Sequence, residues 1–169
     1  MKVILYMAMT VNGMIAREND DTNFISKEEW DSYSAAVRKA GNLVIGHRTY
    51  NILTKQPEFK EFEKVKLVIV SRKKFETLAS NHIISKSPKN SLKLLKGFGT
   101  IVVAGGGILN TSFMKAGLVD EIYLDVEPVV FGRGIRLFSE EDFEAKLKLI
   151  GTKKIYKNEI QLHYKVIRR

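Results

Sequence analysis

The sequence predicts an α/β protein with three layers, α/β/α: a mixed, mostly parallel central sheet with helices on both faces and an antiparallel C-terminal edge hairpin. Short, continuous apolar segments alternate with helical patterns, which is typical of parallel strands buried on both faces. Residues 159–167 instead alternate between apolar and polar side chains, as a half-exposed antiparallel strand does. A chain of 169 residues suits one domain, so we expect a single domain over residues 1–169.

The first half of the chain predicts four strands and two helices. The strands are short apolar runs at residues 2–9, 42–46, 66–71 and 82–85. The first helix, 26–40, begins at Ser26, which forms a capping box with Glu29. It ends at Gly41, a residue suited to the left-handed helix terminus. A short helix over 47–53 follows the second strand directly.

The second half of the chain predicts two more helices, at 91–96 and 107–116, the first of which ends at Gly97. A buried strand over 100–104 lies between them, because its residues are almost all apolar and β-branched. The remaining strands are 119–127 and the two strands of the hairpin, 145–150 and 159–167.

Charge and composition restrict the function classes. The net charge of +9, from 28 Lys and Arg against 19 Asp and Glu, favours an anionic ligand. The lysines are scattered along the chain, so we expect no nucleic-acid surface. No apolar run approaches the roughly 20 residues that span a bilayer, and residues 1–16 are interpreted as a core strand and turn rather than a signal peptide. The lack of cysteine excludes disulfides and makes a reducing cytoplasm the expected location.

Three consecutive glycines follow the strand over 100–104 and open the next helix. Backbone without side chains can approach a pyrophosphate closely, and a helix N-terminus offers free N–H groups and the positive end of the helix dipole. A tight turn alone would need fewer glycines. The residues predicted to bind phosphate here are Gly105, Gly106, Gly107, Ile108 and Leu109.

Two further strand ends carry groups that suit phosphate. One holds a glycine, two potential cations and a hydroxyl at a helix start: Gly46, His47, Arg48 and Thr49. The other, Ser71 and Arg72, suits a phosphomonoester such as the 2′-phosphate that distinguishes NADPH from NADH. A solvated basic turn explains each segment when it is taken alone. Parallel strand ends meet at one edge of a sheet, however, so the three segments reinforce one another.

These segments resemble the dihydrofolate-reductase-like superfamily, and within it the RibD C-terminal family, the reductase domain of the bifunctional riboflavin-biosynthesis deaminase-reductase. The resemblance spans nearly the whole chain, in the segments YMAMTVNGMIA, VIGHRTY, VIVSRKK, VVAGGGILN and LVDEIYLDVEPVVFGRGIRLF. No deaminase motif is present, so the resemblance implies a stand-alone NADPH-dependent reductase.

The resemblance also implies where the cofactor lies. Ala8 and Ile15 would offer backbone groups to the nicotinamide carboxamide, and residues 17–24 would form a mobile cover over the nicotinamide. Residues 46–49 would lie by the pyrophosphate and the adenosine phosphates. Ser71 and Arg72 would take the 2′-phosphate, and residues 105–109 would hold the pyrophosphate.

Two aspartates are the candidate catalytic acids, because hydride transfer leaves the substrate in need of a proton. In folate reductases an acid on the first long helix faces the pterin. Counting from Gly46 without a gap places Trp30 there, and Asp31 only if the following turn is one residue shorter. Asp125 projects from a position where folate reductases carry a threonine that supports the acid. The alternatives are an exposed helix residue for Asp31 and a solvent-facing strand residue for Asp125.

The substrate stays open between a riboflavin precursor, such as 5-amino-6-(5-phosphoribosylamino)uracil, and a pterin-like heterocycle. The arginine that folate reductases use for the substrate carboxylate has no counterpart near Val65, and the acid that riboflavin-pathway reductases carry before the glycine turn is Ala104 here. A phosphoribosyl group would need cations, and Arg17, Arg133 and Arg136 are unassigned. Dihydrofolate reductase itself, a non-catalytic nucleotide-binding protein and a basic nucleic-acid-binding domain are the alternatives.

Two expectations concern assembly and metals. The C-terminal hairpin leaves an edge strand that could pair with a second copy, and proteins of the branch that the chain resembles are often homodimers, so we expect a homodimer. His82 and His163 have no second ligand at a suitable spacing, so we expect no metal site.

Overall fold

The computed structural model describes residues 1–168; residue 169, the last of the predicted domain, lies outside them. The main sheet consists of β1 (Lys2–Thr10), β3 (Asn42–Gly46), β4 (Lys66–Val70), β5 (His82–Ser85), β6 (Thr100–Val103), β7 (Glu121–Glu127), β9 (Lys146–Tyr156) and β10 (Glu159–Ile167). The helices are α1 (Lys27–Ala40), α2 (His47–Leu53), the 3-10 helix η1 (Pro57–Phe62), α3 (Pro88–Leu94) and α4 (Gly107–Lys115). A separate two-stranded sheet pairs β2 (Met14–Ala16) with β8 (Ile135–Arg136).

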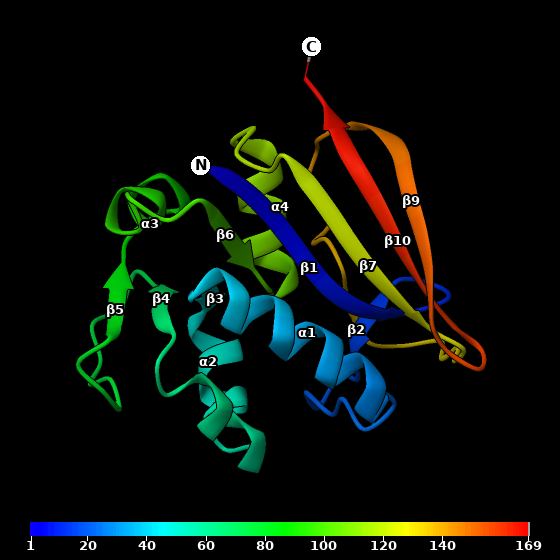
Figure 1. Ribbon diagram of the computed structural model, residues 1–169, viewed down its shortest axis with the longest axis horizontal. Helices are drawn as coiled ribbons and strands as arrows, with labels where there is room; N and C mark the ends of the chain where they lie inside the picture. The colour runs from blue at the N-terminus through cyan, green and yellow to red at the C-terminus, as the bar shows by residue number, and fades with distance from the viewer. Residues whose placement is uncertain (169) are drawn as a thin grey trace.

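The strand order of the main sheet is β5-β4-β3-β6-β1-β7-β10-β9 (Figure 1). Neighbouring strands are parallel from β5 to β7, and β10 and β9 are antiparallel to their neighbours. The predicted fold class, a mostly parallel α/β/α sheet with an antiparallel edge hairpin, is therefore confirmed.

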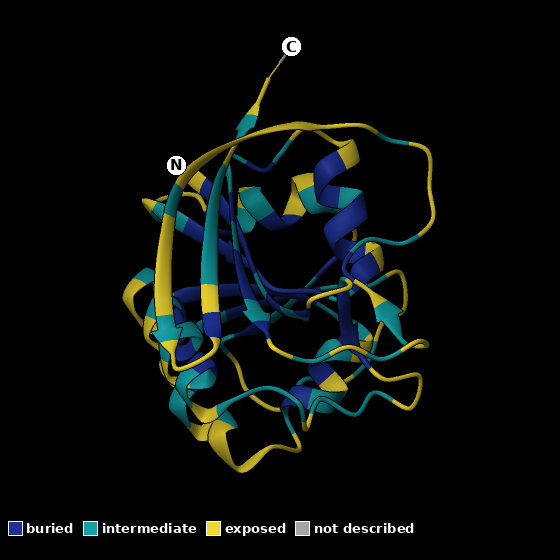
Figure 2. Cartoon of the chain, turned by 90° about the vertical axis from the view of Figure 1, so that its right-hand side faces the viewer, coloured by how far each residue is buried: buried dark blue, intermediate teal, exposed yellow. Residues whose placement is uncertain are grey.

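Two apolar clusters cover opposite faces of the sheet, because successive strand residues point to opposite sides. On one face, Leu5 and Val44 belong to the cluster that includes Phe113 of α4. On the other, Leu43 belongs to the cluster that includes Val37 of α1. Figure 2 shows the buried strands between these helical layers. The sheet is the middle layer, and the carboxyl ends of its parallel strands lie along one edge of it.

Several element boundaries differ from the prediction. α3 begins at Pro88 because the Ser87 hydroxyl caps it, accepting the Asn90 N–H at 3.2 Å, and proline suits a first helical turn. β9 continues to Tyr156 through lysines that were predicted to be a connection, since an edge strand tolerates charged side chains. β2, β8 and η1 were not predicted, because such short elements carry too few residues for a periodic pattern.

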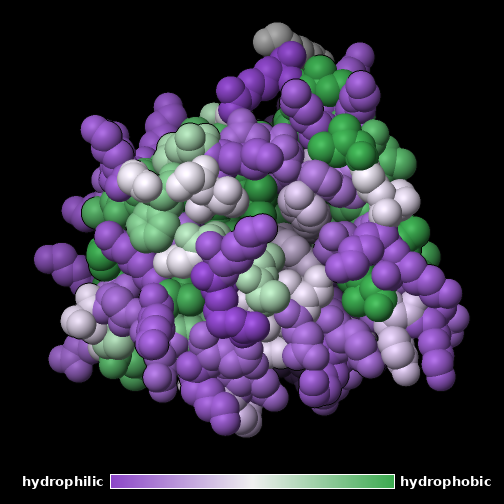
Figure 3. Space-filling model, viewed as in Figure 1, coloured by the Kyte–Doolittle hydropathy of each residue, from purple (hydrophilic) through white to green (hydrophobic). Residues whose placement is uncertain are grey.

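The outer surface is mostly polar in the view of Figure 3, with apolar side chains exposed beside β9 and β10. Leu147, Leu149 and Ile150 of the edge strand are among the exposed large hydrophobic residues. Within residues 1–168, no helix combines the length and the apolar character that crossing a membrane requires.

Candidate active site

A cleft of about 1610 Å³ opens at the carboxyl ends of the parallel strands, where α/β sheets bind their ligands. Every residue that the sequence assigned to the cofactor lines this cleft: Ala8, Ile15, Gly46, His47, Arg48, Thr49, Ser71, Arg72, Gly105, Gly106, Gly107, Ile108 and Leu109. The residues come from five separate segments of the chain, so the fold brings together what the sequence could only suggest.

The backbone of Gly46 and Gly106 lies between the starts of α2 and α4, with the Thr49 hydroxyl beside it. We call the space in front of these two glycines the glycine gap. The Gly46 N–H donates to the Gly105 carbonyl at 2.9 Å, which joins the ends of β3 and β6. A Cβ on Gly46 would lie 3.7 Å from that carbonyl oxygen, and one on Gly106 would lie 3.5 Å from the Thr49 Oγ1. Side chains at either glycine would therefore occupy the gap, which bare backbone leaves open for a phosphate.

Gly107, the third glycine, lacks a side chain for a different reason. A Cβ on Gly107 would lie 2.4 Å from the carbonyl oxygen of Arg136, so the end of β8 packs directly against the first turn of α4. Close packing, rather than phosphate contact alone, explains why this position lacks a side chain.

Unpaired positive charge gathers where β4 and β5 end. Arg72, Lys73 and Lys86 line the cleft there, and among residues 1–168 they form no ion pair. The Ser71 hydroxyl accepts the Lys73 N–H at 3.0 Å and donates to the Lys73 carbonyl at 2.9 Å, which fixes the turn. Lys86 was missed, since nothing in the sequence near it marks a site. This end of the cleft suits an anionic group.

Arg48 lies at the same end but is already paired. Its Nη2 lies 2.8 Å from the Asp20 Oδ1, so it joins α2 to the loop over 17–24. Asp20, Thr22 and Asn23 of that loop line the cleft. The predicted cover therefore lies against the cleft, and Arg48 holds it there.

At the other end, Glu29 brings a buried carboxyl to the cleft, and the sequence prediction missed it. Glu29 lines the cleft and is 3% exposed. The Ser26 hydroxyl accepts the Glu29 N–H at 2.9 Å, as the capping box predicts. The Ser26 N–H, however, donates to the Glu127 Oε1 at 2.7 Å. The Glu29 carboxyl therefore does not accept the Ser26 N–H, as a capping box would require. Because the sequence matched a capping box, Glu29 was not recognised as a candidate site residue.

The surroundings of Glu29 favour its protonated form. Burial raises its pKa well above the usual value, and the neighbouring carboxyls of Asp125, Glu127 and Glu159 raise the pKa further. All three are themselves buried. A carboxylic acid that keeps its proton in a cleft is suited to general acid catalysis.

The structure places the two candidate aspartates in different surroundings, and only the solvent-facing alternative for Asp125 is wrong. Asp31 is at the rim, where it pairs with Lys27 at 2.9 Å and its side chain is 58% exposed. It lies two residues from Glu29 and lines the exposed rim of the cleft, whereas Glu29 lines its buried wall. Asp125 is fully buried rather than solvent-facing, and it is not among the described residues that line the cleft.

Asp125 belongs to a network behind the cleft wall. Its Oδ2 accepts the Tyr6 hydroxyl at 2.8 Å, and its Oδ1 accepts the Gln161 Nε2 at 2.8 Å. Tyr6 lines the cleft and also bonds to the Ser32 hydroxyl at 2.9 Å. Burial raises the pKa of Asp125 to about 6, although the hydrogen bonds from Gln161 and Tyr6 oppose the rise.

We expect the free energy of unfolding to fall by about 1–2 kcal/mol between pH 5 and 7.5. The pKa of Asp125 is higher in the folded protein than in the unfolded chain, so the folded state binds more protons and loses stability as the pH rises through 6. Thermal unfolding at both pH values measures this. Asp125→Asn should flatten the dependence and Asp31→Asn should not. Equal dependence in all three proteins would contradict the assignment.

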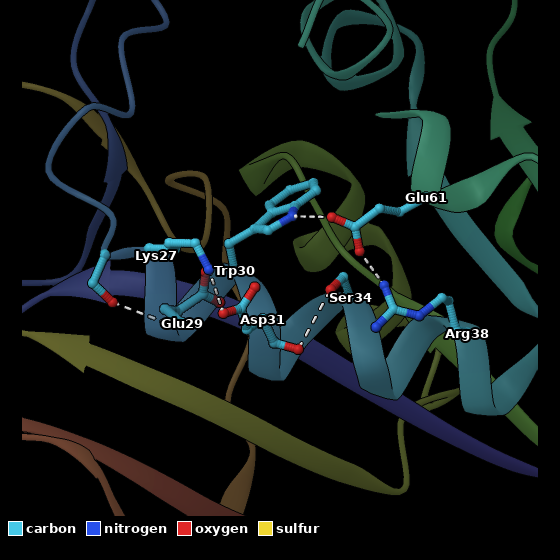
Figure 4. A network of polar contacts seen from close by, with 8 residues as sticks. Lys27, Glu29, Trp30, Asp31, Ser34, Arg38 and Glu61 are labelled. Carbon is cyan, nitrogen blue, oxygen red and sulfur yellow. Dashed lines mark hydrogen bonds and ion pairs between the residues drawn. The ribbon is translucent and has the colours of Figure 1, made fainter. Parts of the chain in front are cut away.

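Trp30 occupies the position where counting back from Gly46 without a gap placed the acid of folate reductases. It also joins two walls of the cleft (Figure 4). Its Nε1 donates to the Glu61 Oε1 at 3.1 Å, and Arg38 pairs with the same carboxylate. These two donors lower the pKa of Glu61. Trp30 and Arg38 belong to α1 and Glu61 to η1, so the contact spans the cleft.

The unassigned arginines do not reach the Glu29 end. Arg17 lies 3.7 Å from the Asp21 carboxylate and over the Phe131 ring, and neither Arg17 nor Arg133 is among the described residues that line the cleft. Arg136 does line it, beside Gly107, with Glu140 at 3.5 Å. Among residues 1–168, no group of three or more His, Asp and Glu residues could hold a metal ion.

Comparison with known proteins identifies relatives of this fold. The uncharacterized protein YwjB of Bacillus subtilis is 32% identical over 172 residues, which cover 96% of this chain and 97% of that protein. A putative riboflavin biosynthesis protein from Shewanella has a TM-score of 0.80 at 19% identity, covering 99% of this chain and 100% of that one. Dihydrofolate reductase from Enterococcus faecalis, complexed with NADP(H), has a TM-score of 0.76 at 16% identity, covering 98% and 96%.

The solved structures show a dihydrofolate-reductase-like fold. The family model described as the RibD C-terminal domain matches residues 1–161, nearly the whole chain. The chain therefore belongs to the RibD C-terminal domain family, a family of reductase-like domains.

Proposed function

We propose that this protein is an NADPH-dependent reductase that transfers a hydride to a small heterocyclic substrate. The observation that carries the proposal is the asymmetry of one cleft. It joins a glycine gap and three unpaired cations at one end to a buried carboxyl, with its pKa raised, at the other. We further propose that the chain acts as a single domain over residues 1–169 and as a cytoplasmic homodimer, with no nucleic-acid or membrane partner.

The residues present fit a doubly phosphorylated dinucleotide. The gap at Gly46 and Gly106 would hold the pyrophosphate, and Ser71 and Arg72 would hold the 2′-phosphate. When bound, the cofactor supplies the hydride. Glu29 would deliver the proton that the reduced substrate needs, and Tyr6, with Asp125 behind it, would fix the wall beside it.

A non-catalytic nucleotide-binding protein would need the cationic end only. The buried carboxyl of Glu29 argues against that alternative, because burying a carboxyl in a cleft lowers stability and is typical of functional sites. The presence of an acid at the site is therefore better explained by catalysis.

Arg72→Ala is expected to weaken NADPH binding by about 10–100-fold, since a charge-assisted contact with a phosphate is worth about 1.5–3 kcal/mol. NADH, which lacks the 2′-phosphate, should bind the variant and the wild-type protein equally. Isothermal titration calorimetry measures both affinities. Lys74→Ala is the matched control, because Lys74 follows in the same basic turn but is not among the residues that line the cleft. Equal loss of NADPH and NADH affinity would reject the assignment of Arg72.

A further inference from the structure

We infer that the substrate is a small heterocycle that carries neither a phosphate nor a carboxylate tail. This inference rests on the proposed reductase function and concerns the half of the cleft between α1 on one side and α2 and η1 on the other. The substrate would thus differ from both phosphoribosyl pyrimidines and dihydrofolate, each of which bears an anionic extension.

Carboxyl side chains outnumber cationic ones in the lining of this half of the cleft, although the whole chain carries +9. Four carboxyl side chains line it: Glu29, Asp31, Glu58 and Glu61. The single lysine of this half, Lys27, already pairs with Asp31 at 2.9 Å. Arg48 of α2 is likewise paired, with Asp20, so among the described residues that line this half no Lys or Arg is free to receive an anionic group. A phosphate placed here would meet like charge, whereas the cations that would attract it lie beyond β4 and β5.

The far end of this half is bridged from wall to wall. Trp30 projects from α1 and donates to Glu61 of η1, and Arg38 pairs with Glu61 from a later turn of α1 (Figure 4). The indole also lies 5.7 Å, centroid to centroid, from the buried Phe62 ring. A substrate tail leaving between α1 and η1 would have to displace this bridge and pass a carboxylate.

Lys64 and Lys66 flank Val65, near the position where folate reductases carry an arginine for the substrate carboxylate. Neither lysine adds a free cation to this half of the cleft. Lys66 donates to the Leu94 carbonyl at 3.1 Å, and Lys64 is exposed. Neither is among the described residues that line the cleft, and Val65 between them is buried. Among the described residues that line this half of the cleft, no free Lys or Arg is therefore available to a tail carboxylate.

The remaining lining suits a flat, uncharged or weakly basic ring. Trp30, Ile52 and Leu53 provide apolar surface, and Glu29 provides one polar contact at the inner wall. A reducible C=N bond fits this arrangement. Its carbon accepts the hydride from NADPH, which becomes NADP⁺, and its nitrogen accepts a proton from Glu29, which water then reprotonates.

Matched pairs of ligands test the inference. With saturating NADP⁺, calorimetry compares 6-methylpterin with folate, and 5-amino-6-ribosylaminouracil with its 5′-phosphate. For at least one ring, the member without the anionic extension should bind at least tenfold more tightly. Equal or tighter binding of both extended members, or no binding of either bare ring, would overturn the inference. Loss of NADP⁺ binding itself would instead count against the proposed function.

A charge reversal at the rim provides a second test. Glu58→Lys should improve the affinity for the phosphorylated uracil relative to its unphosphorylated partner by about threefold or more. Glu63→Lys is the matched control, because Glu63 is exposed on the same segment but is not among the residues that line the cleft. If both variants change the ratio equally, or neither does, local charge does not select the substrate.

Discussion

Glu29→Gln is expected to lower the turnover number by about 10²–10⁴-fold, the usual contribution of a positioned general acid. Glutamine keeps the size and polarity of the side chain but cannot deliver a proton. NADPH affinity should be unchanged, because the glycine gap and the cationic end lie at the other end of the cleft. Stopped-flow measurement of NADPH oxidation under single-turnover conditions separates the chemical step from binding.

One control variant and the pH profile of the wild-type protein make this result specific to Glu29. Glu28→Gln removes the neighbouring carboxyl, which is not among the described residues that line the cleft, and should keep turnover within about twofold of the wild-type value. In the wild-type protein, the rate should fall as the pH rises, because the acid with the raised pKa loses its proton. A Glu29→Gln protein with wild-type turnover and the same pH profile would exclude Glu29 as the proton donor.

Gly106→Val is expected to weaken NADPH binding by about 100-fold or more, which corresponds to about 2.7 kcal/mol. The added side chain would begin 3.5 Å from the Thr49 Oγ1, an ordinary contact distance, so it would fill the gap between the two helix starts without a severe clash. The pyrophosphate would lose its place against bare backbone. Calorimetry with NADPH measures the loss.

The matched control is Gly99→Val, since a Cβ on Gly99 meets nothing within 4 Å and this glycine has no positive φ. That variant should bind NADPH as the wild-type protein does. Thermal unfolding of both variants shows whether either change disturbs the fold. Retained NADPH affinity in a folded Gly106→Val protein would contradict a pyrophosphate site between α2 and α4.

The end of the cleft that holds the glycines and the cations could be predicted from the sequence because its signals are local. Gly105 to Gly107, Gly46 and Ser71–Arg72 each stand directly after a recognisable buried strand, and parallel strands bring such ends to one edge. The chemistry at these positions depends on backbone and on charge, which the residue type reveals without knowledge of the packing.

The Glu29 end of the cleft could not be predicted in the same way, because its character depends on tertiary contacts. Glu29 matched a capping box, and only the hydrogen bond from Ser26 to Glu127, 101 positions later, frees its side chain for the cleft. The bridge between Trp30 and Glu61 joins residues 31 positions apart. Neither contact has a periodic or sequential signature, so the helix pattern predicted the element correctly but not the tertiary contacts of its residues.

A crystal structure with NADP⁺ tests the central claim most directly, since the claim is that one cleft places a dinucleotide between the glycine gap and Glu29. We expect the pyrophosphate against the backbone of Gly105 and Gly106, the 2′-phosphate at Ser71 and Arg72, and the nicotinamide beside Ala8 with its open face toward Glu29. A dinucleotide bound elsewhere on the chain, or one in the cleft with its nicotinamide at the Arg72 end, would contradict the account.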